Sequence, residues 1–314
     1  MSISAFILAA GKGSRMLPIT SDTPKPMLPI LNKPILFHSI KRLLKAQISD
    51  IGVIVRKNDQ VIPSSINNHF PDLNPCFIKQ EKALGTAHAV LQVQDHLTTK
   101  DFLVIAGDSL FSSSFLRKLY ETHLKERNDI TLALEKMDFA LMRESSTVDY
   151  RNGRVLEVRE KPQSPAEILS DLNSAALYIF SDSIFNIING IKKSKRGEYE
   201  LVTAINKTIH LGGQVGGLLT ERVCHISTIR DLWRFNLKFL HEKLKGEANG
   251  NLIGNNVTIM ESATVKNSIL GDNSLIKNGV VLNHCVVLPH TTIDRGYENS
   301  LIKTDYVETF NEND

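Results

Sequence analysis

The chain has 314 residues, more than a single hydrophobic core usually organises, so we expect two domains. With 42% hydrophobic and 23% charged residues it has the composition of a folded protein, and no apolar run approaches the roughly 20 residues of a membrane-spanning helix. The net charge of +3 is small and the Lys and Arg residues are scattered, which argues against nucleic acid as a partner.

The cysteines and the N-terminal residues indicate a compartment. Cys76, Cys224 and Cys285 lie far apart and form no C-x-x-C motif. Residues 1–4 lack the charged start and apolar core of a signal peptide. We therefore expect a protein of the reducing cytoplasm, with no membrane partner and no structural metal.

Residues 3–130 alternate short β-rich runs with amphipathic stretches. Strand patterns occur at Phe6–Leu8, Ile51–Val55, Phe77–Ile78 and Phe102–Ile105, and helical spacing occurs at Ile35–Ala46 and Thr86–Val93. This order predicts a doubly wound α/β sheet that binds its ligands at the carboxyl ends of the strands.

Residues 130–227 are richer in strands. The expected strands are Ile130–Leu134, Arg154–Val158, Ala176–Phe180 and Gln214–Leu219. We interpret this region as an insertion that walls a second substrate pocket.

A helix is predicted next, because apolar residues recur at helical spacing. They are Ile229, Leu232, Trp233, Leu237, Leu240 and Leu244. The helix should end at Gly246, and its apolar face should pack in the core.

After Gly250 the apolar period becomes six residues. Aliphatic residues recur at Ile253, Ile259 and Val265 and, after a four-residue step, at Ile269, Leu275, Val281, Val287 and Ile293. Asn and Gly fill the intervening turns, where left-handed backbone conformations are needed. The period predicts a parallel β-helix of about three coils over residues 250–305.

The residues that follow the first strand form a candidate phosphate-binding loop. Gly11 and Gly13 have no Cβ, so backbone N–H groups can approach a triphosphate closely. Ser14 adds a donor, and Arg15 and Lys25 add positive charge. The spacing matches neither the Walker motif nor the dinucleotide fingerprint, so the glycines alone do not identify the ligand.

A longer segment around this loop is more specific. Residues 8–36 read LAAGKGSRMLPITSDTPKPMLPILNKPIL, which closely resembles the opening signature of the nucleoside-diphosphate-sugar pyrophosphorylases. The resemblance implies a Rossmann-like nucleotidyltransferase domain with a mixed sheet over residues 1–246, followed by a short left-handed β-helix. It also implies the reaction, in which a sugar-1-phosphate attacks the α-phosphorus of a nucleoside triphosphate and releases pyrophosphate.

The resemblance assigns roles on the nucleotide side. Arg15 stabilises the departing pyrophosphate, Lys25 bridges the phosphates and Gln80 reads the base. The other residues that it places at the nucleotide are Leu8, Ala10, Gly11, Gly13, Ser14, Gly85 and Thr86. Because an amide both donates and accepts hydrogen bonds, Gln80 favours a pyrimidine nucleotide, UTP or dTTP.

The resemblance also assigns a metal ligand and a sugar side. Asp108 stands in the element whose Asp holds the catalytic Mg²⁺, and it is a catalytic residue together with Arg15 and Lys25. Lys161 stands in an E-K-P element whose Lys binds the sugar phosphate. The residues expected at the sugar phosphate are Gly107, Glu160, Lys161, Ser174 and Glu198.

Three positions depart from the family pattern. His225 stands where a metal-binding Asp is expected, and we assign it to the metal although imidazole is a poorer Mg²⁺ ligand than a carboxylate. Ser146 and Ala176 stand at glycine positions near the sugar, which predicts a smaller pocket or a displaced ligand.

We expect a Mg²⁺-dependent enzyme that makes a UDP- or dTDP-sugar, with glucose-1-phosphate favoured. Two alternatives stay open. The departures motivate a catalytically weak paralogue that binds nucleotide and regulates a partner. The hexapeptides and His284 motivate a bifunctional nucleotidylyl/acyltransferase.

The β-helix also predicts a homo-oligomer, because the end faces of a solenoid must be covered. We expect Leu288, Ile293 and Ile302 at such subunit contacts.

Overall fold

The computed structural model describes residues 3–220, 224–246 and 250–311, and the predicted domain boundary at residues 247–249 lies outside them. The chain divides into two units, the first comprising Met1–Gly11 with His38–Cys224 and the second Lys12–Phe37 with His225–Asp314. Residues 12–37 therefore cluster with the C-terminal part of the chain, an association that the sequence did not suggest. Within the described residues, no helix combines the length and apolar character that crossing a membrane requires.

The first unit is built on one nine-stranded sheet with the strand order β5-β4-β1-β6-β11-β8-β12-β10-β9. Its strands are β1 (Ser4–Leu8), β4 (Ile51–Arg56), β5 (Cys76–Gln80), β6 (Asp101–Ala106), β8 (Ile130–Lys136), β9 (Ser146–Arg151), β10 (Arg154–Glu160), β11 (Leu172–Ser181) and β12 (Val215–Leu219). The strands from β5 to β6 are parallel, and β11 is antiparallel to both β6 and β8. The predicted mixed sheet is confirmed.

The strand order reverses at β1. The chain proceeds from β1 through β4 to β5 on one side and then crosses to β6 on the other. In such sheets the ligand crevice lies outside the carboxyl ends of the strands at the reversal. The register pairs Leu8 with Ala106, and the Gly107 N–H donates to the Leu8 carbonyl at 3.0 Å. The ends of β1 and β6 are therefore joined directly.

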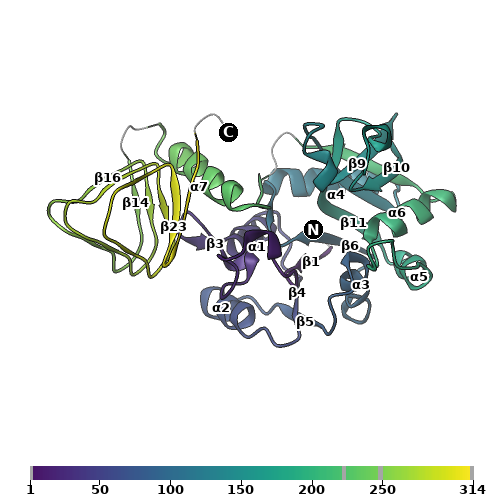
Figure 1. The fold of residues 1–314 in the computed structure, drawn as a ribbon. Helices are drawn as coiled ribbons and strands as arrows, with labels where there is room; N and C mark the ends of the chain where they lie inside the picture. The colour runs from purple at the N-terminus through teal and green to yellow at the C-terminus, as the bar shows by residue number, and fades with distance from the viewer. Residues whose placement is uncertain (1–2, 221–223, 247–249, 312–314) are drawn as a thin grey trace. The chain divides into compact units, whose positions relative to one another are not determined.

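Helices cover both faces of this sheet (Figure 1). The helices up to residue 210 are α1 (Ile35–Lys45), α2 (Val61–His69), α3 (Thr86–Leu91), α4 (Ser113–Glu126), α5 (Ile184–Asn189) and α6 (Leu201–His210). On β8, Ile130 and Leu132 join the core that α3, α5 and α6 complete. Thr131 points to the other face, where its hydroxyl lies 2.9 Å from His123 Nδ1 of α4. This alternation confirms the doubly wound arrangement.

Residues 130–227 do not form a separate insertion. The strands β8 to β12 of this region continue the same sheet, because β11 pairs with β6 as well as with β8. The sequence did not predict β9, in which the buried residues Ser146 and Thr147 are polar. Short elements complete the unit: β7 (Ser109–Leu110), η3 (Gln94–His96), η4 (Met142–Glu144) and η5 (Pro165–Glu167).

In the second unit, α7 (Ile229–Lys243) is the predicted helix. A capping box starts it: Thr228 Oγ1 accepts from the Asp231 N–H at 3.1 Å, and the Asp231 carboxylate accepts from the Thr228 N–H at 2.9 Å. Gly246, with φ 79°, follows its end as expected. The unit also contains η1 (Ser14–Met16), η2 (Lys25–Met27), β2 (Pro29–Ile30) and β3 (Lys33–Pro34), and β13 (Cys224–His225) spans the division.

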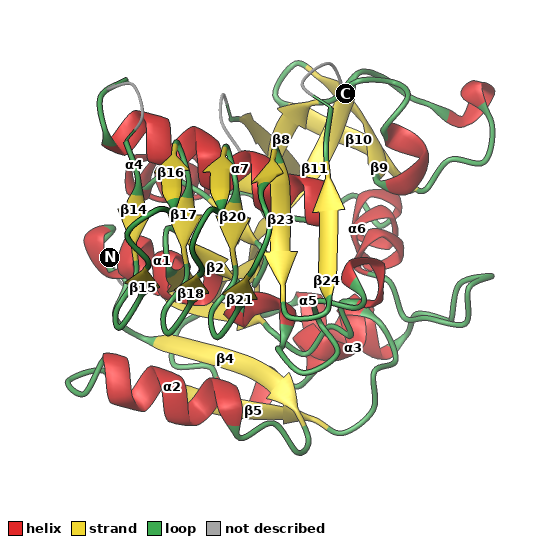
Figure 2. Cartoon of the chain, turned by 60° about the vertical axis from the view of Figure 1, so that its left-hand side comes forward, coloured by secondary structure: helices red, strands yellow, loops and turns green. Residues whose placement is uncertain are grey.

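The predicted β-helix is present, and Figure 2 shows its stacked strands. They are β14 (Leu252–Ile253), β15 (Thr258–Ile259), β16 (Thr264–Lys266), β17 (Ile269–Leu270), β18 (Leu275–Ile276), β19 (Val281–Asn283), β20 (Val286–Val287), β21 (Thr292–Ile293), β22 (Tyr297–Glu298), β23 (Ser300–Lys303) and β24 (Tyr306–Thr309). The register stacks three ladders: Ile253, Leu270, Val287 and Ile302; Ile259, Ile276 and Ile293; and Val265, Leu282 and Tyr297.

The predicted hexapeptide register was wrong by one residue in the second coil. Leu270, Ile276 and Leu282 fill the interior in place of the expected Ile269, Leu275 and Val281. Val281 is 54% exposed, whereas Leu282 is fully buried. The step from Val265 to the next interior residue is five residues, because Asn267 turns the corner with φ 49°.

The ends of the β-helix also differ from expectation. The proposed contact residues Leu288, Ile293 and Ile302 are buried within their own chain, so that prediction was wrong. The first coil instead leaves Ile253 51% and Ile259 37% exposed, although both point in the direction of the interior ladders. At the last coil, β24 pairs antiparallel with β23 (Figure 2).

Ala176 occupies an irregularity of β11. The pairing of β11 with β8 shifts between Ser174 and Tyr178, and within it Ala176 adopts φ 54°. A Cβ in this left-handed conformation is crowded by its own backbone, and glycine is not. The glycine that the resemblance implies at this position would therefore relieve the crowding of the backbone, apart from any effect on the ligand.

Replacing Ala176 by Gly should stabilise the first unit by about 1 kcal/mol, because it removes this crowding. Chemical denaturation followed by circular dichroism measures the change. Ala175→Gly, at the neighbouring buried position, is the matched control and should destabilise. A loss of stability in Ala176→Gly would contradict the strained conformation.

Candidate functional site

The turn after β1 is held by an arginine that sequence reasoning missed. Arg56, at the end of β4, donates through Nε to the Ala10 carbonyl at 3.3 Å and through Nη2 to the Gly11 carbonyl at 2.5 Å. Gly11 is exposed, with open space where a Cβ would lie. Anchored carbonyls fix the peptide planes of this turn, and so the directions of its N–H groups. The sequence feature that could have identified Arg56 is its place as a basic residue directly after the predicted buried strand Ile51–Val55.

Gln80, the predicted base-reading residue, lies buried at the end of β5. Its Nε2 lies 3.2 Å from His88 Nδ1 and donates weakly to the Gly85 carbonyl at 3.5 Å. Burial lowers the pKa of His88, so a neutral ring accepts this bond. Within the described residues the amide oxygen of Gln80 accepts no hydrogen bond, which leaves it as an acceptor for a ligand.

Gly85 and Thr86 have structural roles in the segment between β5 and α3. Gly85 has φ 117°, and a Cβ there would lie 2.4 Å from the Tyr199 carbonyl oxygen, so no larger residue fits. Thr86 Oγ1 accepts from the Leu201 N–H at 3.0 Å, and the Tyr199 N–H donates to the Leu84 carbonyl at 2.8 Å. The segment before α3 is thus fixed to the start of α6.

The predicted metal residues lie in different units. Asp108 follows β6 in the first unit and is half-buried, with Ser109 Oγ 3.4 Å from its Oδ1. His225 belongs to the second unit. No group of three or more His, Cys, Asp or Glu side chains arranged to hold a metal occurs among the described residues.

The rest of the glycine-rich loop lies in the second unit. Gly13 has φ 66° and precedes η1, where Ser14 and Arg15 are exposed. A Cβ on Gly13 would lie 3.2 Å from Lys25 Cβ, and the Thr20 hydroxyl donates to the Gly13 carbonyl at 2.8 Å. Gly13 therefore permits the close approach of Lys25, which opens η2.

A charged cluster on the sugar side joins β10 to the loop before α6. The Arg196 guanidinium lies 3.5 Å from Glu160 and 3.0 Å from Glu200, and the Ser194 hydroxyl donates to Glu200. Burial raises the pKa of Glu160, and Arg196 only partly opposes this effect. The cluster offers carboxylates for sugar hydroxyls and a guanidinium for phosphate.

The acid that the sequence predicts at the sugar, Glu198, is not the acid of this loop that joins the cluster. Glu198 is exposed, whereas Glu200 is buried and contacts Arg196. A role for Glu198 toward the sugar stays a prediction. Neither Glu200 nor Arg196 was selected, although the spacing of Arg196 and Glu200 by four residues was a signal for their pairing.

Ser146 is built into a buried network. Its hydroxyl donates to Asn173 Oδ1 at 2.7 Å and accepts from the Ser174 N–H at 3.1 Å. Ser174 in turn donates to the Tyr178 hydroxyl at 3.0 Å, and burial raises the pKa of Tyr178 to about 12. The added side chain at Ser146 thus joins β9 to β11 through hydrogen bonds.

Lys161 adopts a backbone conformation that is rare outside glycine. Its φ is 48°, and its N–H donates to the Ser145 carbonyl at 2.6 Å. Such conformations cost free energy and cluster at functional sites. The observation supports a role for Lys161 in binding.

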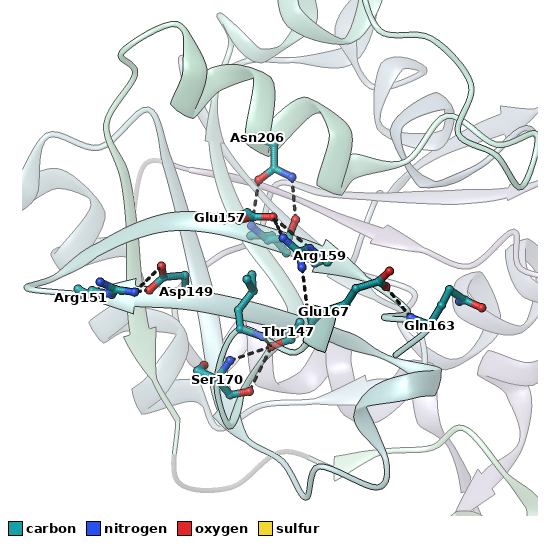
Figure 3. Close-up of polar contacts among 11 residues, drawn as sticks. Thr147, Asp149, Arg151, Glu157, Arg159, Gln163, Glu167, Ser170 and Asn206 are labelled. Carbon is teal, nitrogen blue, oxygen red and sulfur yellow. Dashed lines mark hydrogen bonds and ion pairs between the residues drawn. The ribbon is translucent and has the colours of Figure 1, made fainter. Parts of the chain in front are cut away.

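The strand before Lys161 is held by a polar network. Figure 3 shows the Asn206 amide against β10, where it accepts from the Val158 N–H at 2.9 Å and donates to the Val158 carbonyl at 2.7 Å. Arg159 Nη1 donates to the Glu167 carbonyl at 3.1 Å, and the Glu167 carboxylate accepts from the Gln163 N–H at 2.7 Å. These contacts fix both flanks of residues 160–162.

Comparison with known proteins matches most of the chain to one family. The model of the nucleotidyl transferase family matches residues 4–242. The chain belongs to this family. The match spans the nine-stranded sheet and nearly all of α7, and it leaves out the β-helix.

Three similar proteins are informative. The bifunctional protein GlmU of Methanococcus maripaludis is 35% identical over 83% of this chain, which spans only 61% of that relative. UTP–glucose-1-phosphate uridylyltransferase AglF of Haloferax volcanii is 29% identical over 78% of this chain and 95% of its own length. A crystal structure of a putative glucose-1-phosphate thymidylyltransferase from Bacillus anthracis superposes with a TM-score of 0.67, at 25% identity, over 79% of this chain and 97% of that chain.

Replacing Glu160 by Gln should raise Tm by about 1–3 °C at pH 8. The folded-state pKa of Glu160 is raised, so the stabilisation given by its protonated form is lost as pH rises through that value. The gain of the variant should therefore grow from pH 5 to pH 8. Differential scanning calorimetry across this range measures it.

Glu157→Gln is the matched control, because Glu157 lies on the same strand in a more exposed ion pair with Arg159. That variant should gain no stability. If the Tm of Glu160→Gln is at or below that of the wild type at pH 8, the expectation is contradicted. The ion pair with Arg196 would then stabilise the fold by more than burial of the Glu160 carboxylate destabilises it.

Proposed function

We propose that the protein transfers a nucleoside monophosphate from UTP or dTTP to a sugar-1-phosphate, with glucose-1-phosphate favoured, and releases pyrophosphate. The observation that carries this proposal is the convergence of the Leu8–Gly11 turn, Gln80 and Asp108 at the carboxyl edge of one sheet. Membership of the nucleotidyl transferase family supports it.

The proposed pyrimidine preference rests on the Gln80 amide. With Nε2 directed at His88, its oxygen is oriented to accept from a base. The N3–H of uracil or thymine is such a donor, whereas the corresponding atom of cytosine is an acceptor. Relatives named for uridylyl and thymidylyl transfer agree with this choice.

The reaction joins two anions, so the protein must neutralise and align them. An oxygen of the sugar phosphate attacks the α-phosphorus, the bond from that phosphorus to the bridging oxygen breaks, and pyrophosphate leaves. The nucleophile is already ionised, so no general base is required. Arg15 and Lys25 would stabilise the leaving pyrophosphate, and Lys161 and Arg196 would hold the sugar phosphate.

Mg²⁺ is the proposed cofactor, and the donor chemistry fits it. Mg²⁺ is commonly held by one or two carboxylates together with substrate phosphates. We assign this role to Asp108, a half-buried carboxylate after β6; among the described residues no group of three or more His, Cys, Asp or Glu side chains is arranged to hold a metal. When bound, the ion neutralises phosphate charge. His225 stays a predicted ligand.

The acyltransferase alternative would use His284 as its general base. The chain spans about three fifths of the length of the bifunctional relatives that it matches. His284 lies against α7, and its Nδ1 is buried and has no hydrogen-bond partner within the described residues. A general base for an acceptor needs an accessible nitrogen, so in His284 this role would fall to Nε2 and not to the buried Nδ1.

Pyrophosphate release measured over a matrix of nucleoside triphosphates and sugar-1-phosphates, with and without Mg²⁺, tests the proposal. We expect turnover that requires Mg²⁺ and is at least tenfold faster with UTP or dTTP than with purine nucleotides. Nucleotide binding without turnover for any pair would instead support the regulatory paralogue.

We also propose that the chain forms a homo-oligomer through its β-helix. The end face of the first coil exposes the apolar side chains of Ile253 and Ile259 to solvent, so we assign the subunit contact to this face. Ile259→Lys should reduce the mass measured by light scattering to that of the monomer. Val281→Lys, at an exposed side position of the same β-helix, should leave it unchanged. A wild-type monomer would contradict the proposal.

A further inference from the structure

The part of the glycine-rich loop that carries Arg15 and Lys25 has little regular structure of its own. Between η1 and η2 the side chain of Ile19 is fully buried, whereas Leu17, Pro18 and Ser21 are exposed and the side chain of Asp22 is 63% exposed. Ile19 is the apolar anchor of this segment, and the exposed part around Asp22 depends on polar contacts for its geometry. Two sets of polar contacts within the second unit hold the segment between Arg15 and Asn32.

One anchor comes from the last coil of the β-helix. Lys303, at the end of β23, donates through Nζ to both carboxylate oxygens of Asp22 at 2.7 and 2.8 Å and to the Ile19 carbonyl at 3.3 Å. Its side chain is only 20% exposed. Lys303 lowers the pKa of Asp22, chiefly through this hydrogen bond. The Lys303 ammonium group therefore binds the loop at both Ile19 and Asp22, which are three residues apart.

A second set of anchors holds the chain after Lys25. Asn236 of α7 is buried, and its amide donates to the Pro29 carbonyl at 2.9 Å and accepts from the Leu31 N–H at 2.8 Å. Asn32 Nδ2 donates to the Leu270 carbonyl, inside the β-helix, at 2.8 Å. The segment that bears Lys25 is therefore fixed on one side by Lys303 and on the other by α7 and the second coil.

We propose that the β-helix positions the phosphate loop, and that Lys303 is the positioning residue that acts through Asp22. Lys303 reaches the chain three residues before Lys25 and four residues after Arg15, so it restrains the segment that joins the two cations. This inference rests on the proposed function, in which those cations bind the triphosphate. It gives the appended β-helix a role in the nucleotidyl transfer itself.

Three variants test the coupling: Lys303→Met, Asp22→Asn and the double variant. Each single change should raise KM for the triphosphate about three- to tenfold and leave KM for the sugar-1-phosphate unchanged, because a misplaced loop weakens only one substrate. The double variant should lose no more than either single one, since both break the same contact. Lys277→Met, an exposed lysine of the same β-helix, is the control and should behave as wild type.

Hydrogen exchange of the full-length chain gives a readout that does not depend on turnover. Amides of residues 14–25 should exchange faster in Lys303→Met and in Asp22→Asn, with the sheet of the first unit unchanged. Asp22→Asn alters an exposed side chain and keeps its shape, so it tests the coupling even where Lys303→Met folds poorly. Lys303→Arg should restore most of the wild-type KM.

Unchanged loop exchange in both single variants, or additive losses in the double variant, would overturn the positioning role. If the wild-type protein shows no turnover, only the proposed function is contradicted. The hydrogen-exchange experiment still tests the link between Lys303 and the loop.

Discussion

Parallel pairing of β1 with β4 and β6 is the constraint on which the proposed nucleotide site depends. Because parallel strands end at the same edge, the turn after Leu8, the guanidinium of Arg56 and the Asp108 carboxylate emerge together although they are far apart in the sequence. β5 adds Gln80 to that edge. Arg56 then ties two of these strand ends to each other through the carbonyls of Ala10 and Gly11.

Two neighbouring residues on the proposed sugar side occupy unfavourable positions. Partial burial raises the pKa of Glu160, whose side chain is 28% exposed, and Lys161 holds a left-handed backbone conformation. Arg196 is shared between Glu160 and Glu200, so neither carboxylate has a guanidinium of its own. Such arrangements lower stability and persist where a ligand needs them. They make this cluster the strongest structural support for a bound sugar phosphate.

The sequence predicted features that depend on local pattern. The period of six predicted the β-helix, and the spacing of apolar residues with Gly246 predicted α7 and its end. It did not predict the interior register of the second coil. A turn at Asn267 is compatible with a spacing of either four or five residues between Val265 and the next interior residue. Arg56, Glu200 and Lys303 were missed because their roles come from contacts between distant elements, and the φ of Ala176 is set by a shift in strand pairing.

The central claim is that a pyrimidine triphosphate binds at the carboxyl edge of the nine-stranded sheet. A crystal structure of the protein grown with dTTP and Mg²⁺ tests it most directly. The account predicts the base within hydrogen-bond distance of the Gln80 amide, the phosphates at the turn Leu8–Gly11 and the metal at Asp108. A nucleotide bound elsewhere, or a base that makes no contact with Gln80, would contradict it.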